Sequence, residues 1–402
     1  MPLIKPFRAL RPVPERAADV LAPPYDVLSS SEARQRATGR PWSFLHVSKP
    51  EIDLDPETDP YGKAVYAKAA ENLKRMIDAG VLMRDTAPCY YAYRLTWRGH
   101  TQTGLACVAS LADYASNRIR KHELTTPVKE DDRVRQIEAV SAQTGPVMIG
   151  YPATAEIDSL LAKAASGKPA VDVTADDGVR HELWIISDAA VIEKLTKAFD
   201  ALPALYIADG HHRSAAAARV AARRKTDGYF LAVLFADREM TILDYNRVVK
   251  DLNGRTPAQL IDELGKSFIV TASDKPVRPD VSNEFGMYLA GRWYKLTLRP
   301  NMIESDPIGR LPVTMLTRHV IEPLLGVRDQ RTDKRIDFVG GARGLEGLQA
   351  RVDSGEMAVA FALYPTQMGD LMAVADAGLI MPPKSTWFEP KLADGMVNHV
   401  LD

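Results

Sequence analysis

The chain has 402 residues, of which 46% are hydrophobic and 26% charged, a composition that suits two globular domains and excludes a disordered chain. Its 51 Lys and Arg residues nearly balance its 52 Asp and Glu residues, which argues against binding to nucleic acid or to an anionic membrane surface. Two cysteines, and the lack of any run of about 20 apolar residues, predict a cytoplasmic protein without a membrane span.

Helices and strands alternate in the first part of the chain. Ser29 to Ser31 predict the start of a helix at about residue 31, and Gly80 predicts the end of an amphipathic helix that begins near residue 61. Strands are expected at 89–97 and 102–111 (as a hairpin), 145–152, 181–187, 205–209, 229–236 and 240–249, and further helices after the charged loop 120–133, at 188–201 and at 211–224.

A second α/β unit is predicted to follow residue 253, so the expected domains are 1–253 and 254–402. The fold class predicted for the whole chain is α/β, or α+β, with mixed sheets. In the second unit, helices are expected at 257–264, 313–325, 344–353 and 367–376, and strands at 286–291, 293–299, 335–339 and 357–364.

The stretch "LYIADGHHRSAAAARVAARR", residues 205–224, predicts a strand, a tight turn and a helix. The first N–H groups of such a helix are unpaired, and together with the helix dipole they form a site for an anion such as phosphate. Positively charged side chains on this first turn are repelled by the positive end of the helix dipole unless an anion binds beside them. Their presence here therefore favours a binding site. The alternative is that Asp209 caps the helix and the histidines are solvated. The residues expected to contact a nucleotide here are Gly210, His211, His212, Arg213 and Ser214.

The segment 120–133, "RKHELTTPVKEDDR", supplies the residue types that phosphoryl transfer requires. We expect Glu123 to act as general base or metal ligand, and His122 and Lys129 to contact phosphate or substrate. Asp209 and His212 are the other catalytic candidates, and Asp209 is also the tentative ligand of Mg²⁺. A solvated charged loop is the alternative for this segment, although Pro127 prevents a simple helical ladder of charges.

Three further segments contain candidate residues. Tyr25 and Asp26 follow two prolines, where they either contact a substrate or form a structural turn. Asn246 and Arg247 interrupt an apolar strand, as the wall of a site or as part of a buried network. The segment 384–391 either folds over a pocket as a lid or tethers the C-terminus.

Other motifs are incomplete. Gly265-Lys266-Ser267 resembles the end of a P-loop, but the first glycine of that motif is replaced by Leu260. Zinc is not expected, because the cysteines are unpaired and the neighbouring side chains of His211 and His212 point in different directions on a helix.

The segments "IKPFRALRP", "LAPPYDVLSSSEAR", "IRKHELTTPVKEDDR", "LYIADGHHRSAAA" and "MPPKSTWFEPKL" closely resemble the bacterial and archaeal family catalogued as domain of unknown function 1015. More distantly, "ADGHHRSAAA" resembles the turn of the ParB/sulfiredoxin fold, which opens a helix and holds nucleotide phosphates. The cysteine of sulfiredoxins is replaced by His211, so the resemblance does not imply sulfinic-acid reduction. The Glu and first Arg of the ParB turn are also replaced by histidines, which argues against CTP gating.

A third branch of that fold contains free-serine kinases, which phosphorylate L-serine with ATP or ADP. The resemblance therefore implies a nucleotide-dependent kinase of a small hydroxyl metabolite, with L-serine as the expected substrate and ATP or ADP with Mg²⁺ as cofactors. Two alternatives stay open: a ParB-like nucleotide-binding regulatory or DNA-associated protein, and a hydrolase of phosphorylated metabolites.

Overall fold

The computed structural model describes residues 1–225 and 228–401, which form two compact units. The first comprises Met1–Met240 together with Pro390–Asp402, and the second comprises Thr241–Glu389. The boundary expected after residue 253 therefore lies inside the second unit, and the end of the chain returns to the first unit. Within the described residues, no helix combines the length and the apolar character needed to cross a bilayer.

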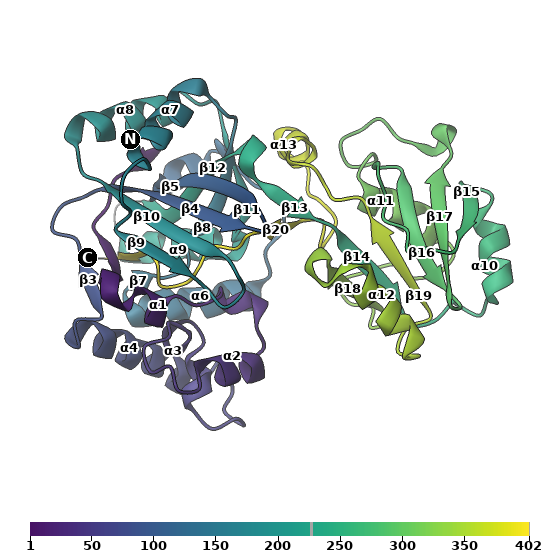
Figure 1. Cartoon of the computed structure of the whole chain (residues 1–402), viewed down its shortest axis with the longest axis horizontal. Helices are drawn as coiled ribbons and strands as arrows, with labels where there is room; N and C mark the ends of the chain where they lie inside the picture. The colour runs from purple at the N-terminus through teal and green to yellow at the C-terminus, as the bar shows by residue number, and fades with distance from the viewer. Residues whose placement is uncertain (226–227, 402) are drawn as a thin grey trace. The chain divides into compact units, whose positions relative to one another are not determined.

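The first unit is built around a nine-stranded sheet with the order β6-β11-β8-β12-β5-β4-β10-β9, in which β1 pairs with β5 (Figure 1). The pairs β6–β11 and β8–β12 are parallel and the others are antiparallel, which confirms the mixed α/β class. The strands of this sheet are β1 (Ile4–Lys5), β4 (Tyr90–Trp97), β5 (His100–Ser110), β6 (Ile119–Arg120), β8 (Val147–Tyr151), β9 (Val171–Thr174), β10 (Arg180–Ile186), β11 (Leu205–Asp209) and β12 (Tyr229–Ala236).

Helices pack against the large sheet of the first unit, and a further group of helices forms the N-terminal part of that unit. Side chains of α7 and α8 pack into the main apolar core of this sheet. The helices are α1 (Ala17–Val20), α2 (Ser30–Ala37), α3 (Leu45–Ser48), α4 (Lys63–Asp78), α5 (Leu111–Ala115), α6 (Pro127–Val140), α7 (Ala155–Ala164), α8 (Ala189–Asp200) and α9 (His211–Arg224), with short 3-10 turns η1 (Pro14–Arg16), η2 (Tyr25–Val27), η3 (Pro50–Asp53) and η4 (Asp237–Glu239).

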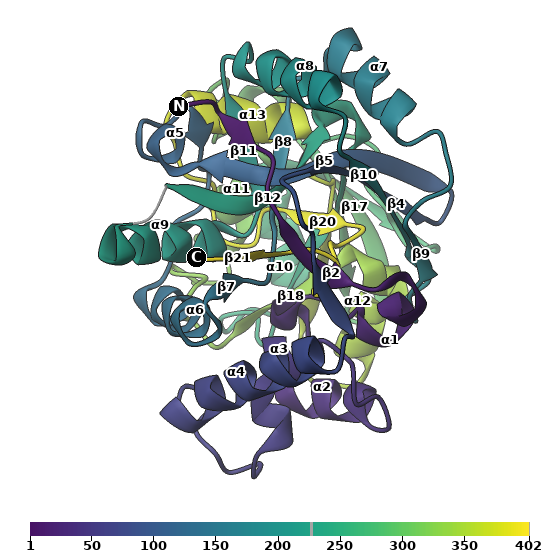
Figure 2. The same ribbon diagram turned by 90° about the vertical axis from the view of Figure 1, so that its left-hand side faces the viewer.

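A second, four-stranded sheet has the order β3-β2-β21-β7. Its strands are β2 (Ala9–Pro12), β3 (Leu82–Arg84), β7 (Ala142–Gln143) and the C-terminal β21 (Asn398–Val400). Figure 2 shows β21 close to the C-terminus and next to β7. β21 also pairs with β2, with Ala9 opposite His399, so segments near the two ends of the chain are neighbours in this sheet. Local sequence patterns do not encode a contact between residues so far apart in the sequence.

The helices α6 and α9 pack side by side and run in the same direction (Figure 2). At their N-terminal ends the backbone N–H of Thr126 donates to Nε2 of His212, and at their C-terminal ends Arg224 donates to Ser141. Val134 and Ile137 of α6 pack against Ala216 and Val220 of α9, so the small alanines permit this close approach.

The charged segment expected to be a loop through Arg133 is helical from Pro127 onward. Proline occupies the first helical position, where its missing N–H is not needed, so it begins α6 rather than interrupting it. The expectation that Pro127 prevents a helical arrangement of these charges is therefore wrong. Lys129 and the three acidic residues that follow it lie in the first turns of the helix.

The second unit contains a six-stranded antiparallel sheet and a separate two-stranded sheet. The run 240–249, expected as one strand, is divided between these two sheets as β13 and β14. The elements are β13 (Thr241–Leu243), β14 (Tyr245–Val249), α10 (Pro257–Leu264), β15 (Phe268–Ser273), β16 (Glu284–Leu289), β17 (Arg292–Leu298), η5 (Pro300–Met302), α11 (Pro312–Leu316), a π-helical turn η6 (Thr317–Ile321), β18 (Ile336–Gly340), η7 (Gly341–Arg343), α12 (Gly344–Asp353), β19 (Val359–Leu363), α13 (Met368–Asp376) and β20 (Trp387–Glu389).

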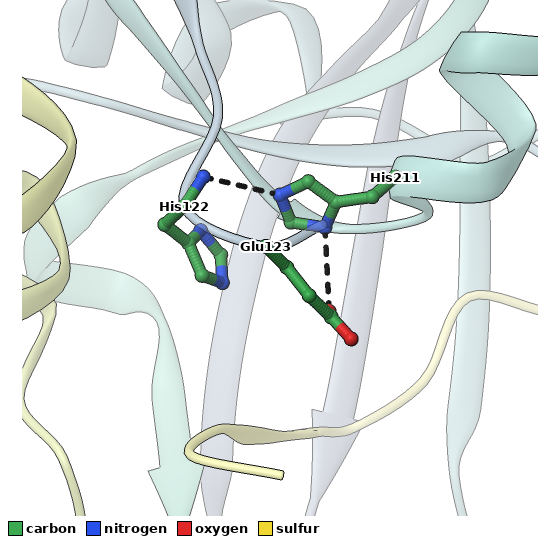
Figure 3. A group of neighbouring side chains, drawn as sticks. All are labelled: His122, Glu123 and His211. Atoms are coloured by element: carbon green, nitrogen blue, oxygen red, sulfur yellow. Dashed lines mark hydrogen bonds and ion pairs between the residues drawn. The ribbon is translucent and has the colours of Figure 1, made fainter. Parts of the chain in front are cut away.

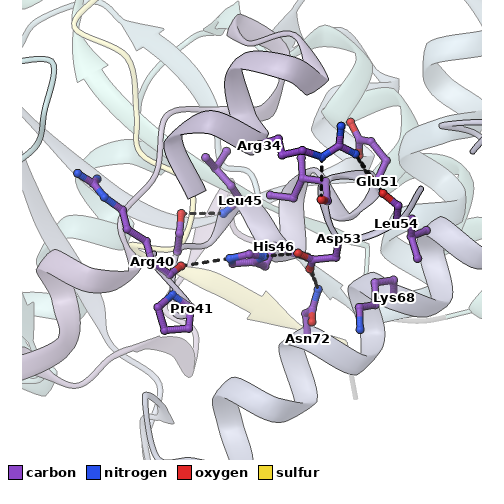
Figure 4. Close-up of polar contacts among 12 residues, drawn as sticks. Arg34, Arg40, Pro41, Leu45, His46, Glu51, Asp53, Leu54, Lys68 and Asn72 are labelled. Carbon is purple, nitrogen blue, oxygen red and sulfur yellow. Dashed lines mark hydrogen bonds and ion pairs between the residues drawn. The ribbon is translucent and has the colours of Figure 1, made fainter. Parts of the chain in front are cut away.

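A hydrogen-bond network around the buried Asn72 holds the N-terminal helices of the first unit together (Figure 4). Nδ2 of Asn72, on α4, donates to the carbonyl of His46 and to Oδ2 of Asp53, each at 2.7 Å. Nδ1 of His46 lies 2.8 Å from Oδ1 of Asp53. One amide therefore joins α4 to both α3 and η3.

We predict that Asn72→Ala lowers the free energy of unfolding by about 1–3 kcal/mol, because it leaves two acceptors in this network without their donor. The measurement is denaturant unfolding of the full chain. Lys74→Ala on the same helix removes only an exposed ion pair with Asp78 and should change stability by less than about 0.5 kcal/mol. Equal losses for the two variants would contradict a stabilising role for the network.

Candidate functional site

The turn between β11 and α9 requires a glycine. Gly210 has φ +101°, a backbone conformation that other residues adopt only with strain. A Cβ added there would also lie 3.0 Å from Nε of Arg213. The residue that precedes α9 is Gly210, with no side-chain cap, so the alternative in which Asp209 caps the helix is wrong. The predicted strand, turn and helix are present.

His211 is buried on the first turn of α9 against a second histidine (Figure 3). Its ring packs edge-on against that of His122, with the centroids 4.5 Å apart. The backbone N–H of His122 donates to Nε2 of His211 at 3.4 Å, and Oε2 of Glu123 lies 3.6 Å from Nδ1 of His211. Three of the residues expected to form the site therefore meet.

Strand pairing explains this meeting. β6 runs parallel to β11, with Ile119 opposite Leu205 and Arg120 opposite Tyr206. Chain segments that leave parallel neighbouring strands emerge at the same edge of the sheet. The segment that begins with His122 is thereby placed beside the turn at Gly210.

Burial keeps both imidazoles neutral near pH 7. It lowers the pKa of His122 to about 4, against a hydrogen bond to the backbone of Ile207 that favours the charged form. Burial also holds the pKa of His211 well below its usual range, and the nearby ring of His122 adds to this effect. Neutral imidazoles offer a lone pair to a proton donor or a metal ion.

The Arg213 guanidinium lies beneath the turn rather than at the surface, and its side chain is only 8% exposed. Nη2 donates to Oδ2 of Asp209 at 2.8 Å, and Nη1 donates to the carbonyl of Pro146. Asp26 lies within 3.8 Å of the same Nη2. Arg213 therefore joins three chain segments, and direct phosphate contact by this residue stays a prediction.

Asp209 lies between two cations. In addition to Arg213, Nζ of Lys391 lies 3.7 Å from its Oδ2. Burial by itself would raise the pKa of Asp209, but Lys391 and Arg213 hold it below its usual range. Two cations within about 4 Å oppose the binding of Mg²⁺, so the surroundings of Asp209 fit a resident Mg²⁺ ion poorly. Ser214, also expected to contact nucleotide, is fully buried and donates to the carbonyl of His211.

A cleft of about 310 Å³ contains four of the predicted residues: Tyr25, Asp26, Lys129 and His212. It opens where the N-termini of α6 and α9 adjoin, so the positive ends of two helix dipoles add there. His212 comes from α9 and Lys129 from α6. Burial and the charge of Lys129 lower the pKa of His212. The other lining residues include Lys49, Glu51, Tyr61, Tyr66, Asp132 and Arg133.

Sequence reasoning missed a layer of residues beneath this cleft. The backbone N–H of Tyr25 donates to Oδ2 of the buried Asp394 at 3.0 Å, and the Arg133 guanidinium lies 3.8 Å from the centre of the Tyr25 ring. Asp394 and Lys391 belong to the returning C-terminal segment. Lys391 lies at the end of the segment 384–391, for which the sequence predicted a lid or a tether but no role for this lysine. Asp394 lies outside every segment that the sequence singled out, so only the tertiary contact identifies it.

The chain matches the family described as protein of unknown function (DUF1015) over residues 4–314. It belongs to that family. No curated protein matches the chain.

Solved structures similar to this family member include a conserved hypothetical protein from Pyrococcus furiosus, at 13% identity and TM-score 0.35, covering 70% of this chain and 91% of that one. A free serine kinase in complex with AMP is similar at 10% identity and TM-score 0.34, covering 70% and 89%. SbnI with C-terminal truncation, from Staphylococcus aureus, is similar at 11% identity and TM-score 0.38, covering 73% and 86%. The ParB/sulfiredoxin-like fold stays a prediction.

Asn246 and Arg247 belong to the second unit, where both are buried in hydrogen-bonded networks. Asn246 accepts from the backbone N–H of Leu363, and Nη2 of Arg247 donates to the carbonyls of Pro383 and Lys384. Burial lowers the pKa of Arg247 to about 9. These contacts favour the structural alternative for the pair. Part of the segment 384–391 forms β20, which pairs with β13, an arrangement typical of a tether.

We predict that Arg213→Ala lowers the free energy of unfolding by about 3–5 kcal/mol, because it leaves Asp209 and the Pro146 carbonyl without their buried partner. Arg219→Ala, two turns later on the same helix, removes a more exposed pair with Glu130 and Asp131 and should cost at most about 1 kcal/mol. Urea unfolding curves of both variants make the comparison. Similar costs would show that Arg213 does not support the turn and would favour a direct role in binding.

Asp394 provides a prediction about pH. Burial raises its pKa to about 7, against the charges of Arg213 and Arg133. Between pH 4 and 7 the folded chain therefore holds a proton that the unfolded chain has lost, and stability falls as the pH rises through this range. The fall should be on the order of 4 kcal/mol and should be absent in Asp394→Asn. Asp78→Asn, on the surface of α4, should keep the wild-type profile, and a flat profile in the wild type would contradict the prediction.

Proposed function

We propose that this protein is a phosphotransferase that moves a phosphoryl group from ATP or ADP to a hydroxyl of a small metabolite. The observation that carries the proposal is that His212 and Lys129, from the N-termini of two parallel helices, line the same cleft as the carboxylate of Asp26. Phosphoryl transfer requires positive groups on the phosphates and a carboxylate near the acceptor hydroxyl, and both are present.

The nucleotide phosphates are proposed to bind at the adjoining helix ends. Nε2 of His212 already accepts from the backbone of Thr126, which leaves Nδ1 for a ligand. Lys129 is exposed, and Lys49 lies on the wall of the same cleft. Tyr61 is 45% exposed and offers a surface on which a nucleobase can stack.

Asp26 is proposed to accept the proton of the acceptor hydroxyl. Its side chain is partly exposed and lines the cleft, whereas Glu123, the base expected from the sequence, pairs with His211 and is not among the lining residues. Arg213 lies 3.8 Å from Asp26 and orients its carboxylate. When bound, Mg²⁺ neutralises phosphate charge, and we propose that it enters with the nucleotide rather than on Asp209.

Free L-serine is the first acceptor to test, because the turn at Gly210 resembles that of free-serine kinases. The experiment incubates the pure chain with ATP or ADP, Mg²⁺ and serine or pooled amino acids, and follows new phosphate esters by ³¹P NMR. We expect a phosphate ester that depends on the nucleotide. Release of phosphate from phosphoserine without nucleotide would instead favour the hydrolase alternative.

The proposed roles predict that some variants lose nucleotide affinity and that another loses the rate of the chemical step. His212→Gln and Lys129→Ala should each weaken nucleotide binding about 10- to 100-fold, through loss of a charge-assisted contact. Asp26→Asn should lower kcat about 10²- to 10⁴-fold while leaving nucleotide affinity nearly unchanged. Calorimetric titration and steady-state rates make the measurement, with Lys163→Ala on α7 as a matched control. Full turnover by Asp26→Asn would show that another group accepts the proton.

A further inference from the structure

Glu123 and the two buried histidines form a cluster that the phosphotransferase proposal does not use. Each of His122, Glu123 and His211 offers one ligand-type atom, and these atoms all lie within 4.8 Å of one another. The two rings and the carboxylate converge in Figure 3, with Glu123 below the ring of His211. They come from the two segments that leave β6 and β11, so the rigid sheet sets their separation.

The spacing suits ligands that share one ion. Nδ1 of His211 and Oε2 of Glu123 are 3.6 Å apart. Two ligand atoms in a tetrahedral site with bonds of about 2.0–2.2 Å are separated by roughly 3.4 Å. A hydrogen bond between the same atoms would be shorter, at about 2.7–2.9 Å. The observed distance is therefore closer to that of two metal ligands than to that of a hydrogen-bonded pair.

The cluster also has coordinating capacity that the protein does not use. Nδ1 of His122 is buried and has no hydrogen-bond partner. A metal ion on Nδ1 of His211 requires the proton of that ring on Nε2, which breaks the contact from the His122 backbone N–H; that contact is already long, at 3.4 Å. A buried polar atom without a partner is costly unless a ligand satisfies it. The Glu123 side chain is 46% exposed, so the cluster is accessible from solvent.

We infer that His122, Glu123 and His211 form a binding site for one divalent transition-metal ion, such as Zn²⁺ or Mn²⁺. Two imidazoles and one carboxylate favour such ions over Mg²⁺ and Ca²⁺, which prefer oxygen ligands. Three protein ligands leave a coordination position for water or for a ligand oxygen, as in open zinc sites. The sequence argument against zinc considered the cysteines and the neighbours His211 and His212, and it did not consider His122 as a ligand. This inference is independent of the proposed phosphotransfer.

The test measures metal binding by the full-length chain in the absence of nucleotide. After chelator treatment, the chain is dialysed against Co²⁺, Zn²⁺ and Mn²⁺ in turn; bound metal is counted by elemental analysis, and Co²⁺ is followed by its visible absorption. We expect one ion per chain. Glu123→Gln should weaken binding at least about 10- to 100-fold, because even changes in residues around a metal site have effects of that size.

Glu193→Gln, which alters an exposed carboxylate on α8, serves as the matched control and should bind metal like the wild type. His211→Gln provides a second variant, and circular dichroism checks its fold. If it does not fold, the half-exposed Glu123 decides the outcome alone. Binding of less than about 0.2 ion per chain under saturating metal, or binding that Glu123→Gln leaves unchanged, overturns the inference. Because no nucleotide is present, either result is separate from the outcome of the kinase assay.

Discussion

The parallel pairing of β6 with β11 is the constraint on which the site depends. Two short strands bring together the segments that follow them, one with His122 and Glu123 and the other with Gly210 and His211. Without this pairing, nearly ninety positions of the chain would separate the two histidines, with no local reason for them to meet. The ring contact, the carboxylate contact and the common direction of α6 and α9 all follow from it.

Charge is distributed unevenly around the turn at Gly210. On one side, Arg213 and Lys391 hold the partly exposed Asp209 as a carboxylate between cations. On the other, His212 and Lys129 lie at the cleft where two helix N-termini adjoin. The first arrangement is internally compensated and stabilises the turn. The cleft has as many acidic as basic side chains, with Asp26, Glu51 and Asp132 against Lys49, Lys129 and Arg133, so its positive character comes from the two helix N-termini. An anion is therefore expected at the cleft rather than beside Asp209.

The C-terminal segment gives the first unit features that the N-terminal sequence alone lacks. β21 pairs with β2 and β7, and the backbone of Asp394 pairs with that of Ala22. Through these contacts the last part of the chain places Lys391 and Asp394 beneath residues of the turn and cleft. Asp394 has a raised pKa because it is buried near another carboxylate, Asp26, and this links the stability of the site to pH.

The sequence by itself determined the local structure of this protein. The mixed α/β class, the hairpin of β4 and β5, the helix closed at Gly80 and the strand, turn and helix around Gly210 follow from periodicity and from glycine's freedom, which act over a few residues. The tertiary structure alone decided that His122 meets His211, that the Arg213 guanidinium lies inward, and that Asp394 lies beneath Tyr25. These outcomes depend on strand pairing and burial between distant segments, where many arrangements satisfy the same local pattern and only the packing of the whole unit selects one.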